Sequence, residues 1–546
     1  MSNPNHRDVP GSEKVRQRVS ALLKKREAGR EQNETIPTRP VYSPSPASFG
    51  QRSLWFAEQV SPGNAYNLQI ALRLKQKLNL DCVHAAWQEI LKRHEVLRTT
   101  FRFIDNEVMQ FISPELKPSM RVIDLTGSSF PDHESQVRDL LEKEEQQNFD
   151  LAAGPLVRPV LCKLGQEEYT LCFTMHHIIA DGWSLGVLLR ELTELYAAFS
   201  EGRPNPLPPL AIQYADFAWW QRQWLSGDRL EKQLSYWRRQ LSNPPILELP
   251  ADHPRNTTEN RHGAQWDFQI SAELRERLRE LGRRNQASLF MVLLAAWKVL
   301  LCHYSGQTDI IVGAPIANRT RVEIESLIGF FVNTLVLRTD LSGNPSFKEM
   351  LSRVKATTLD AYDHQDVPYE ELVVKLRPDR NAGHAPFFTT MLNWVNTPGL
   401  DVAETPSEAA RPQNPAARFD LALHIMETNG ALPARLEYSA DLSEETTIKR
   451  MSEHFQNLLA GIVATNADKR LSELPLLSPE ECHLLLYGWN QGVEQFPTNE
   501  TILELLEDQA CKTQDRAAVV CKGETWTYGE LHQRANQLAH FLKKMG

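Results

Sequence analysis

The sequence predicts a mixed α/β protein with more than one domain, and three observations lead to this fold class. Helical and strand-like patterns interleave in both halves of the chain. The 546 residues are enough for two to four domains of ordinary size. The composition, with 41% hydrophobic and 24% charged residues, is typical of a soluble globular protein. The chain can therefore bury substantial hydrophobic cores.

Charge and targeting patterns exclude several classes of function. Sixty Lys and Arg against 69 Asp and Glu give a formal net charge of -9, without a basic surplus for nucleic acid or an anionic membrane. The longest apolar run, Leu289–Trp297, is too short to cross a bilayer. No apolar stretch near the N-terminus indicates a signal peptide, and the seven cysteines form no CxxC pair. We therefore expect a cytoplasmic protein with reduced thiols and no membrane contact.

Residues 1–47 precede the first globular pattern. Ser12–Glu27 is basic with apolar residues at helical spacing, and a proline-rich segment follows it, which indicates a leader helix and an extended linker. Two interpretations of the helix stay open: a solvated leader, or a docking element for an upstream protein. Short charged helices are marginal on their own, which favours the solvated leader.

The first globular region covers residues 48–225. An apolar stripe along Asp81–Arg93 predicts a helix, and the alternation of Tyr169–Ile178 predicts a strand. Leu185–Phe199 predicts another helix, which the proline cluster at 204–209 ends. Helices and strands of this first region are thus expected to share one core.

A second mixed region covers residues 226–473. Leu289–Tyr304 predicts a helix and Asp309–Gly313 predicts a strand. The segment Pro398–Arg418, rich in Pro, Ala and Glu, indicates a long surface loop. No short-period repeat is present, so a solenoid is not expected.

The segment Met175–Ser184, MHHIIADGWS, carries the clearest chemistry. In an extended strand, His176 and His177 point to opposite faces, so they cannot easily serve one site, which disfavours zinc. Asp181 and Gly182 supply a turn, and the helix that follows begins with N–H groups that lack helical acceptors. An imidazole beside backbone donors suits acyl transfer, because it can take a nucleophile's proton while the donors face an oxyanion. A buried structural histidine pair is the alternative interpretation.

This segment resembles the HHxxxDG signature of condensation domains of nonribosomal peptide synthetases, which belong to the chloramphenicol acetyltransferase superfamily. Six further segments resemble motifs of the family in the same order. They are SFGQRSLW at 48–55, RHEVLRTTF at 93–101, YADFAWWQ at 214–221, IGFFVNT at 328–334, HQDVPYE at 364–370 and a match at 380–388. The resemblance extends from about residue 48 to 470 through seven ordered motifs.

The resemblance implies two chloramphenicol-acetyltransferase-like lobes in a V-shaped pseudo-dimer, here residues 48–225 and 226–473. It implies amide formation between an upstream acyl or peptidyl thioester and the amine of a downstream aminoacyl thioester. Both substrates would arrive on phosphopantetheine arms of peptidyl carrier proteins, and neither a metal nor a bound cofactor is implied. The expected partners are the two carrier proteins and an adjoining adenylation domain, and the chain is expected to be monomeric.

The resemblance assigns the reacting site to two positions. His177 matches the second histidine of the motif and is expected to be the active-site imidazole. Whether it acts as a base or only positions the amine stays open, because an α-amine titrates near about 7.7–8.0 and is partly neutral at working pH. The N–H of Gly182 is expected to position substrate or to stabilise the oxyanion.

Other residues are expected to support this site. His176 is expected to pack in the core. Asp181 is expected to be structural and to pair with Arg93 or Arg98, because a buried carboxylate needs a partner. Two more residues, Ser184 and Asn333, are expected to line the substrate tunnel.

Three types of activity stay open within this resemblance. Elongation would accept a peptidyl donor, whereas a starter domain would accept a fatty acyl group from a carrier or from acyl-CoA and would begin a lipopeptide. The segments RHEVLRTTF and HHIIADGWS favour the elongating type. A non-catalytic platform that recruits other enzymes is a further alternative, which the intact histidine motif disfavours.

The C-terminal part differs from the rest. Residues 474–496 indicate a linker, and 497–546 begin another α/β pattern. TWTYGEL at 525–531 and ANQLA at 535–539 resemble the opening of an adenylation domain. The Gly-rich nucleotide loop of that family does not occur before Gly546, so we expect the start of an incomplete adenylation domain that activates no amino acid.

Overall fold

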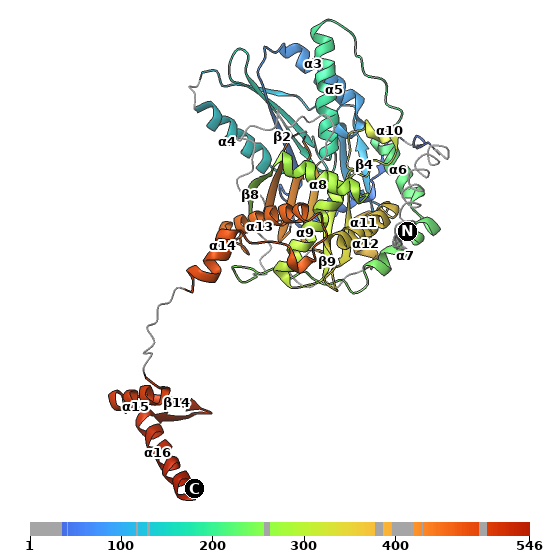
Figure 1. The fold of residues 1–546 in the computed structure, drawn as a ribbon. Helices are drawn as coiled ribbons and strands as arrows, with labels where there is room; N and C mark the ends of the chain where they lie inside the picture. Colours follow the sequence, from blue (N-terminus) through green and yellow to red (C-terminus); the bar gives the residue numbers. More distant parts are fainter. Residues whose placement is uncertain are drawn as a thin grey trace, which may run out of the picture. The chain divides into compact units, whose positions relative to one another are not determined.

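The computed structural model describes residues 35–40, 42–115, 118–127, 132–255, 262–376, 386–395, 417, 419–428, 430–490 and 500–546. The expected leader helix and nearly all of the expected loop at 398–418 lie outside these residues. The chain forms two compact units, one up to Leu476 and one from Leu477 to Gly546. The first unit contains two lobes that share no β-sheet (Figure 1). Their interleaved helices and strands confirm the mixed α/β class.

The first lobe has a four-stranded sheet in the order β2-β7-β6-β5 and a three-stranded sheet in the order β1-β4-β3. Its strands are β1 (Ser45–Pro46), β2 (Asn67–Leu74), β3 (Thr99–Ile104), β4 (Glu107–Ile112), β5 (Arg121–Asp124), β6 (Val157–Lys163) and β7 (Tyr169–His176). Its helices are α2 (Phe49–Val60), α3 (Leu80–Arg93), α4 (Asp132–Gln146), α5 (Gly182–Ser200) and α6 (Tyr214–Trp224). The helices predicted near 81–93 and 185–199 are confirmed as α3 and α5.

Strand β7 is an inner strand of its sheet, between β2 and β6, and all eight of its residues are buried. Side chains on one face join the cluster formed with α3 and α5, for example Phe173, whose ring lies 5.4 Å from that of Trp87. Side chains on the other face, such as Cys172, pack with Val137 and Leu141 of α4. The predicted strand is confirmed, but it ends at His176, so His177 lies in the turn that follows.

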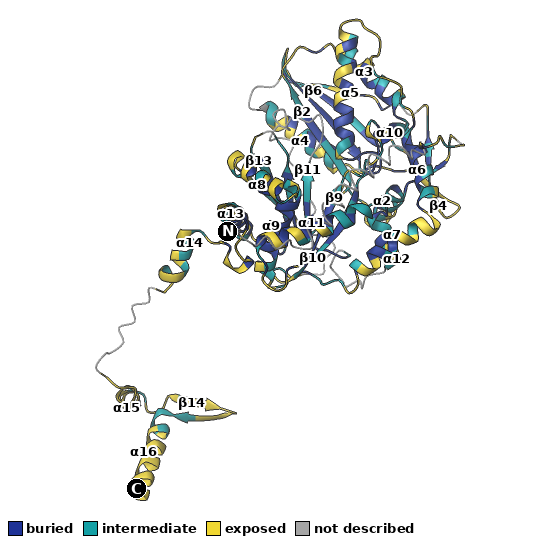
Figure 2. Cartoon of the chain, turned by 45° about the vertical axis from the view of Figure 1, so that its right-hand side comes forward, coloured by how far each residue is buried: buried dark blue, intermediate teal, exposed yellow. Residues whose placement is uncertain are grey.

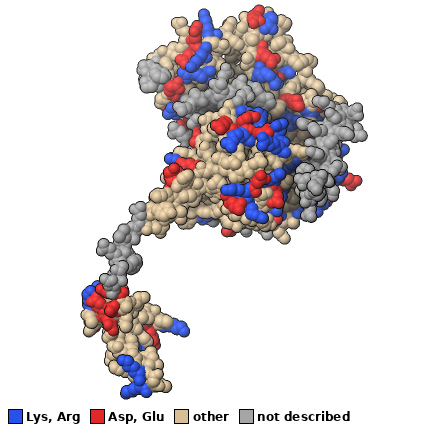
Figure 3. Space-filling model, viewed as in Figure 1, with Lys and Arg blue, Asp and Glu red and all other residues tan. Residues whose placement is uncertain are grey.

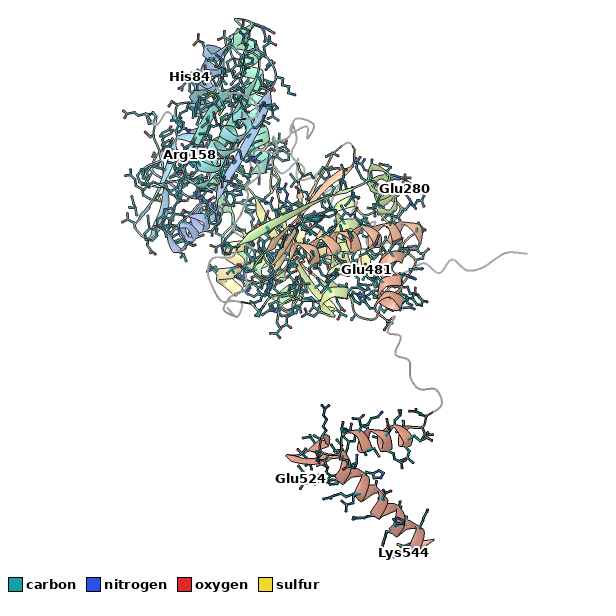
Figure 4. The ribbon with its side chains drawn as sticks, turned by 90° about the vertical axis from the view of Figure 1, so that its left-hand side faces the viewer. His84, Arg158, Glu280, Glu481, Glu524 and Lys544 are labelled. Carbon is teal, nitrogen blue, oxygen red and sulfur yellow. The ribbon has the colours of Figure 1, made fainter. Side chains whose placement is uncertain are left out.

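The second lobe has a six-stranded sheet in the order β10-β9-β11-β12-β13-β8, in which β11 runs parallel to β9 and β12. Its strands are β8 (Gly263–Ile270), β9 (Asp309–Ile316), β10 (Asn333–Asp340), β11 (Thr390–Val395), β12 (Leu421–Met426) and β13 (Leu432–Ser439). Its helices are α7 (Gly227–Gln240), α8 (Ala272–Arg284), α9 (Leu289–Ser305), α11 (Phe347–Asp363), α12 (Tyr369–Leu376) and α13 (Glu445–Ala464). Figure 4 labels Arg158 in the first lobe and Glu280 on α8 in the second.

Helix α9 forms the centre of the second core. Every residue from Met291 to Leu301 is buried, and the helix begins at Ser288, whose side chain accepts the N–H of Met291. The run includes Lys298, whose ammonium donates to the Leu337 carbonyl at 2.6 Å and to the Thr339 hydroxyl at 2.7 Å. Burial lowers the pKa of Lys298 to about 7, because desolvation penalises the charged form. The predicted helix and the strand β9 after it are confirmed.

Residues 317–332, which we call the crossover segment, connect β9 to β10 and contain the short helix α10 (Val322–Glu325). Five apolar side chains of this segment are buried in the core of the first lobe, in one cluster with side chains of α5 and α6. They are Ile324, Leu327, Ile328, Phe330 and Phe331. A Cβ on Gly329 would overlap the Tyr214 ring, so only glycine permits this close approach. The second lobe thus completes the hydrophobic core of the first.

Among the described residues, no single helix is long and apolar enough to cross a membrane. The helices α8 and α9 reach that length only as a pair, and they meet at 102°.

The second unit contains the helices α14 (Pro479–His483), α15 (Ile502–Lys512) and α16 (Tyr528–Met545) and the hairpin of β14 (Ala517–Cys521) and β15 (Glu524–Thr527). Capping boxes begin α15 at Thr501 and α16 at Thr527. Many of its large apolar side chains are exposed, as the yellow colour of α15 and α16 in Figure 2 shows. They include Ile502, Leu503, Val520, Leu538, Phe541, Leu542 and Met545. This unit alone encloses almost no core.

Candidate active site

His177 lies in the turn between β7 and α5 and is half-buried. Its backbone N–H donates to the Tyr66 carbonyl at 2.7 Å, and its ring meets that of Phe330 edge-on at 5.0 Å between centroids. The Nδ1 atom lies 2.9 Å from the carbonyl oxygen of Ala180. A carbonyl can only accept, so Nδ1 carries the proton and the lone pair of the neutral imidazole is on Nε2. The turn therefore fixes the tautomer that a general base requires.

His176 has different surroundings and is almost fully buried. Its Nδ1 accepts the N–H of Ile178 at 3.1 Å, and its Nε2 lies 3.7 Å from a carboxylate oxygen of Glu58. The rings of Tyr66 and Phe149 pack around it at 6.2 and 6.1 Å. These contacts support the expected packing role.

Asp181 is the N-cap of α5 and is 2% exposed. Its Oδ1 accepts the backbone N–H of Ser184 at 2.8 Å, and its Oδ2 accepts the N–H of Phe331 at 3.0 Å. The Nη2 of Arg319 donates to Oδ1 at 3.2 Å, and this guanidinium is 1% exposed. The carboxylate therefore joins the start of α5 to the crossover segment.

The predicted pairing of Asp181 with Arg93 or Arg98 is wrong. Arg93 donates to Glu191 at 3.1 Å, in a buried group with His94. Arg98 donates to two backbone carbonyls, those of Leu91 and Ser113. Both arginines are thus held within the first lobe, and the cation beside Asp181 comes from the second lobe.

Arg319 is the central residue that the sequence analysis missed. Its Nη1 donates to the carbonyls of Ile324 and Leu327, and its guanidinium lies 4.2 Å from the centre of the Phe331 ring. Burial lowers the pKa of Arg319, while the charge of Asp181 opposes this shift. The available signal was a basic residue in the polar stretch just before IGFFVNT, which no local spacing connects to Asp181.

Gly182 is the first residue of α5 and is exposed, with no atom within 4 Å of the position where a Cβ would lie. A first-turn N–H has no acceptor within its own helix, and the positive end of the helix dipole adds to its field. The N–H of Gly182 can therefore donate to a group from outside the helix.

Ser184 and Asn333 are both buried, and their polar atoms form hydrogen bonds within the protein. The Ser184 hydroxyl lies 2.7 Å from Asp181 and 3.0 Å from the N–H of Gly329. The Asn333 amide donates to the carbonyls of Gln365 and Val367 and accepts the N–H of Tyr369. These hydrogen bonds use the polar groups of both side chains, and the expected place of the two residues along a substrate tunnel stays a prediction.

Charges on the surface alternate in sign. Figure 3 shows Lys and Arg beside Asp and Glu over one face of the protein, and Glu280 on α8 pairs with both Arg283 and Arg284. Within the described part of the chain, no three His, Cys, Asp or Glu side chains form a group that could hold a metal ion.

Comparison with known proteins identifies a family and relatives that match most of the chain. The family model described as the condensation domain matches residues 43–486. A linear gramicidin synthase protein of Brevibacillus parabrevis is 42% identical over 512 residues, which are 92% of this chain and 10% of that protein. Malpinin synthetase of Mortierella alpina is 41% identical over 506 residues, which are 92% of this chain and 6% of that protein. The chain thus spans a tenth or less of the length of these curated relatives.

Solved structures share the fold. The X-domain from teicoplanin biosynthesis, solved in complex with OxyB, is 26% identical with a TM-score of 0.71, and the match covers 82% of this chain and 99% of that one. The four-domain nonribosomal peptide synthetase AB3403 has a TM-score of 0.74 at 22% identity over 95% of this chain and 40% of that one.

Proposed function

The chain belongs to the condensation domain family of nonribosomal peptide synthetases, and we propose that it forms an amide bond between two carrier-bound substrates. Members of this family are amide-forming acyltransferases, and their substrates come on carrier proteins without a cofactor bound to the domain itself. The proposed donor is an upstream peptidyl thioester, and the proposed acceptor is the amine of a downstream aminoacyl thioester. The fixed tautomer of His177 at the start of α5 carries this proposal.

The proposed reaction uses two groups of the chain. The acceptor amine attacks the thioester carbonyl carbon, and its proton passes to Nε2 of His177 as the C–N bond forms. The N–H of Gly182 donates to the oxyanion of the tetrahedral intermediate. The C–S bond then breaks, and the thiolate recovers the proton from the imidazolium. Asp181 and Arg319 support the reaction from outside it, because they hold the start of α5 in place.

Replacement of the imidazole tests the assignment. We expect His177→Ala to reduce amide formation about 10²–10⁴-fold, the usual contribution of a general base or of a positioning group. His84→Ala is the matched control, because His84 is an exposed histidine on α3 of the same lobe (Figure 4). An unchanged rate for His177→Ala with carrier-bound substrates would contradict the assignment.

The type of donor is decided by a second experiment. One aminoacyl carrier is offered together with a peptidyl carrier, a fatty acyl carrier or an acyl-CoA, and the products are identified by mass spectrometry. We expect product from the peptidyl carrier. Product only from the fatty acyl donors would instead make the chain a starter domain.

A recruitment platform without catalysis is the second candidate function, because the X-domain that shares this fold is solved in complex with OxyB. The intact hydrogen-bonded turn at His177 favours catalysis. The absence of amide product from every donor would support the platform.

We also propose the domain organisation stated for the sequence, with residues 497–546 belonging to an adenylation domain. Two observations support it: the exposed apolar side chains of α15 and α16, and the fold likeness to AB3403 over 95% of this chain. Fifty residues bury too little apolar surface for an independent core.

A further inference from the structure

Helix α2 directs two buried polar side chains, Gln51 and Glu58, toward the end of β7 and the turn that follows it. The two residues lie two helical turns apart. Gln51 is fully buried, and its amide donates to the Ile178 carbonyl at 3.1 Å. Glu58, seven residues later and therefore on the same face of the helix, is 6% exposed. The helix thus contacts the segment from His176 to Ile178 at two points, one of them a carboxylate.

Each oxygen of the Glu58 carboxylate lies beside a different group of the protein. Its Oε1 accepts the N–H of Gly63 at 3.1 Å, and its Oε2 lies 3.7 Å from Nε2 of His176. Since Nδ1 of His176 accepts the N–H of Ile178, the neutral ring carries its proton on Nε2, on the side of Glu58. Within the described residues, neither Oε2 nor this Nε2 has a hydrogen-bond partner. The two groups therefore face each other inside the core.

The same carboxylate is linked to the backbone of His177. Gly63 belongs to the loop between α2 and β2, and Tyr66 at the end of that loop accepts the N–H of His177 at 2.7 Å. Glu58 therefore restrains the histidine pair by two routes, through the ring of His176 and through this loop.

We propose that Glu58 is a positioning residue for the condensation reaction, acting through His176 on the placement of the His177 imidazole. This inference rests on the proposed function. A buried carboxylate is costly unless its surroundings compensate it, and the compensation here comes from the Gly63 N–H and the His176 ring. The charge thereby fixes the ring of His176, whose backbone leads directly into the reacting residue.

Glu58→Gln tests this role, because it keeps the size of the side chain and an acceptor for Gly63 but removes the charge. We expect kcat to fall about 10- to 100-fold, the loss typical of a small misplacement of a reacting group, while KM for both carrier substrates is unchanged. Glu58→Asp keeps the charge but moves it away from His176, because the side chain is one methylene group shorter. We expect its kcat to lie between that of the parent and that of Glu58→Gln. A decrease in thermal stability with unchanged kcat for both variants would overturn the proposal.

Glu144→Gln is the matched control. Glu144 is a buried carboxylate of the same lobe, bonded to Arg121 and Arg158, and it does not contact the histidine pair. We expect this variant to lose stability and to keep its kcat. An equal fall in kcat for Glu144→Gln and Glu58→Gln would show a general effect of buried charge loss and would overturn the proposal.

A double-mutant cycle with His176→Gln tests the route of the effect. If Glu58 acts through His176, Glu58→Gln lowers kcat much less in the His176→Gln background than in the parent. An equal decrease in kcat in both backgrounds would refute the route through His176.

A spectroscopic measurement separates this inference from the proposed function. With ¹⁵N-labelled histidine, we expect the parent to show His177 protonated on Nδ1 and Glu58→Gln to show a mixture of tautomers. A parent that forms no amide would refute the proposed function, whereas an unchanged tautomer in Glu58→Gln would refute the positioning role.

Discussion

Replacement of Asp181 by Asn is expected to damage the fold more than loss of the reacting imidazole. Both carboxylate oxygens of Asp181 accept N–H donors, from Ser184 and Arg319 on one oxygen and from Phe331 on the other. An asparagine amide has one oxygen and one NH₂ group. In either orientation its NH₂ group faces a buried donor, and the charge opposite Arg319 is lost.

The size of the effect follows from these contacts. Loss of one member of a buried ion pair costs about 3–5 kcal/mol. The unfolding entropy of a unit of this size is about 0.9 kcal/mol/K, at about 2.1 cal/mol/K per residue, so the melting temperature should fall by about 3–6 °C. His177→Ala removes a half-buried ring and one hydrogen bond, worth about 1 kcal/mol, and should lower the melting temperature by only about 1 °C.

Calorimetry and a double-mutant cycle check this reasoning. Asp181→Asn and Arg319→Gln should be strongly non-additive, because they remove the two halves of one contact. Asp181→Asn and Arg98→Gln should be additive within about 0.5 kcal/mol, because Arg98 bonds only to Leu91 and Ser113 in the described structure. Melting of Asp181→Asn at the temperature of the parent, or a stronger coupling of Asp181 to Arg98 than to Arg319, would contradict this prediction.

Three further predictions follow from other features. Because the folded pKa of Lys298 is lowered to about 7 from 10.5, the unfolded chain binds more protons between these values, so the free energy of unfolding should rise by up to about 4 kcal/mol as pH rises through this range. Urea unfolding from pH 7 to 10 should show this rise in the parent and a flatter curve in Lys298→Met. Gly329→Ala should destabilise the protein by several kcal/mol, because its Cβ would overlap the Tyr214 ring, whereas Gly182→Ala meets no atom and should melt normally; equal melting would refute this contrast. A chain that stops at Phe496 should keep its amide-forming activity, and the chain of 546 residues should show no amino-acid-dependent pyrophosphate exchange. Exchange activity, or loss of amide formation on truncation, would contradict the proposed boundary.

The regular elements could be predicted from the sequence because their signals are local. The apolar stripe of α3, the buried run of α9 and the alternation of β7 each lie within one window of the chain. Local pattern could not show that β7 is buried on both faces, since this depends on α4, which packs there from elsewhere in the lobe. It also placed His177 in the strand, whereas the strand ends one residue earlier.

The histidine motif indicated the reacting segment, but the groups that hold it come from distant parts of the chain. Asp181 clearly required a cation, and the sequence offered two arginines of a neighbouring motif. The structure places Arg319 there instead, 138 residues further along the chain. Glu58 and Gln51 were missed for the same reason, because α2 contacts the motif only through tertiary packing, more than a hundred residues apart in the chain. Residues that contact each other across a hundred residues of sequence form no motif of fixed spacing, so a local pattern cannot reveal the contact.

The crossover segment also affects the order in which the protein can fold during synthesis. The first lobe is translated through α6 while the five apolar side chains that complete its core are still about a hundred residues away. At ribosomal rates of about 5–20 residues per second, this interval lasts about 5 to 20 seconds. Throughout it, the rings of Tyr214 and Phe217 lack Phe331, which packs against both of them in the complete fold. A chimaera that joins the first lobe of one such protein to the second lobe of another should therefore keep residues 317–332 with the first lobe, because they belong to it in packing although not in sequence.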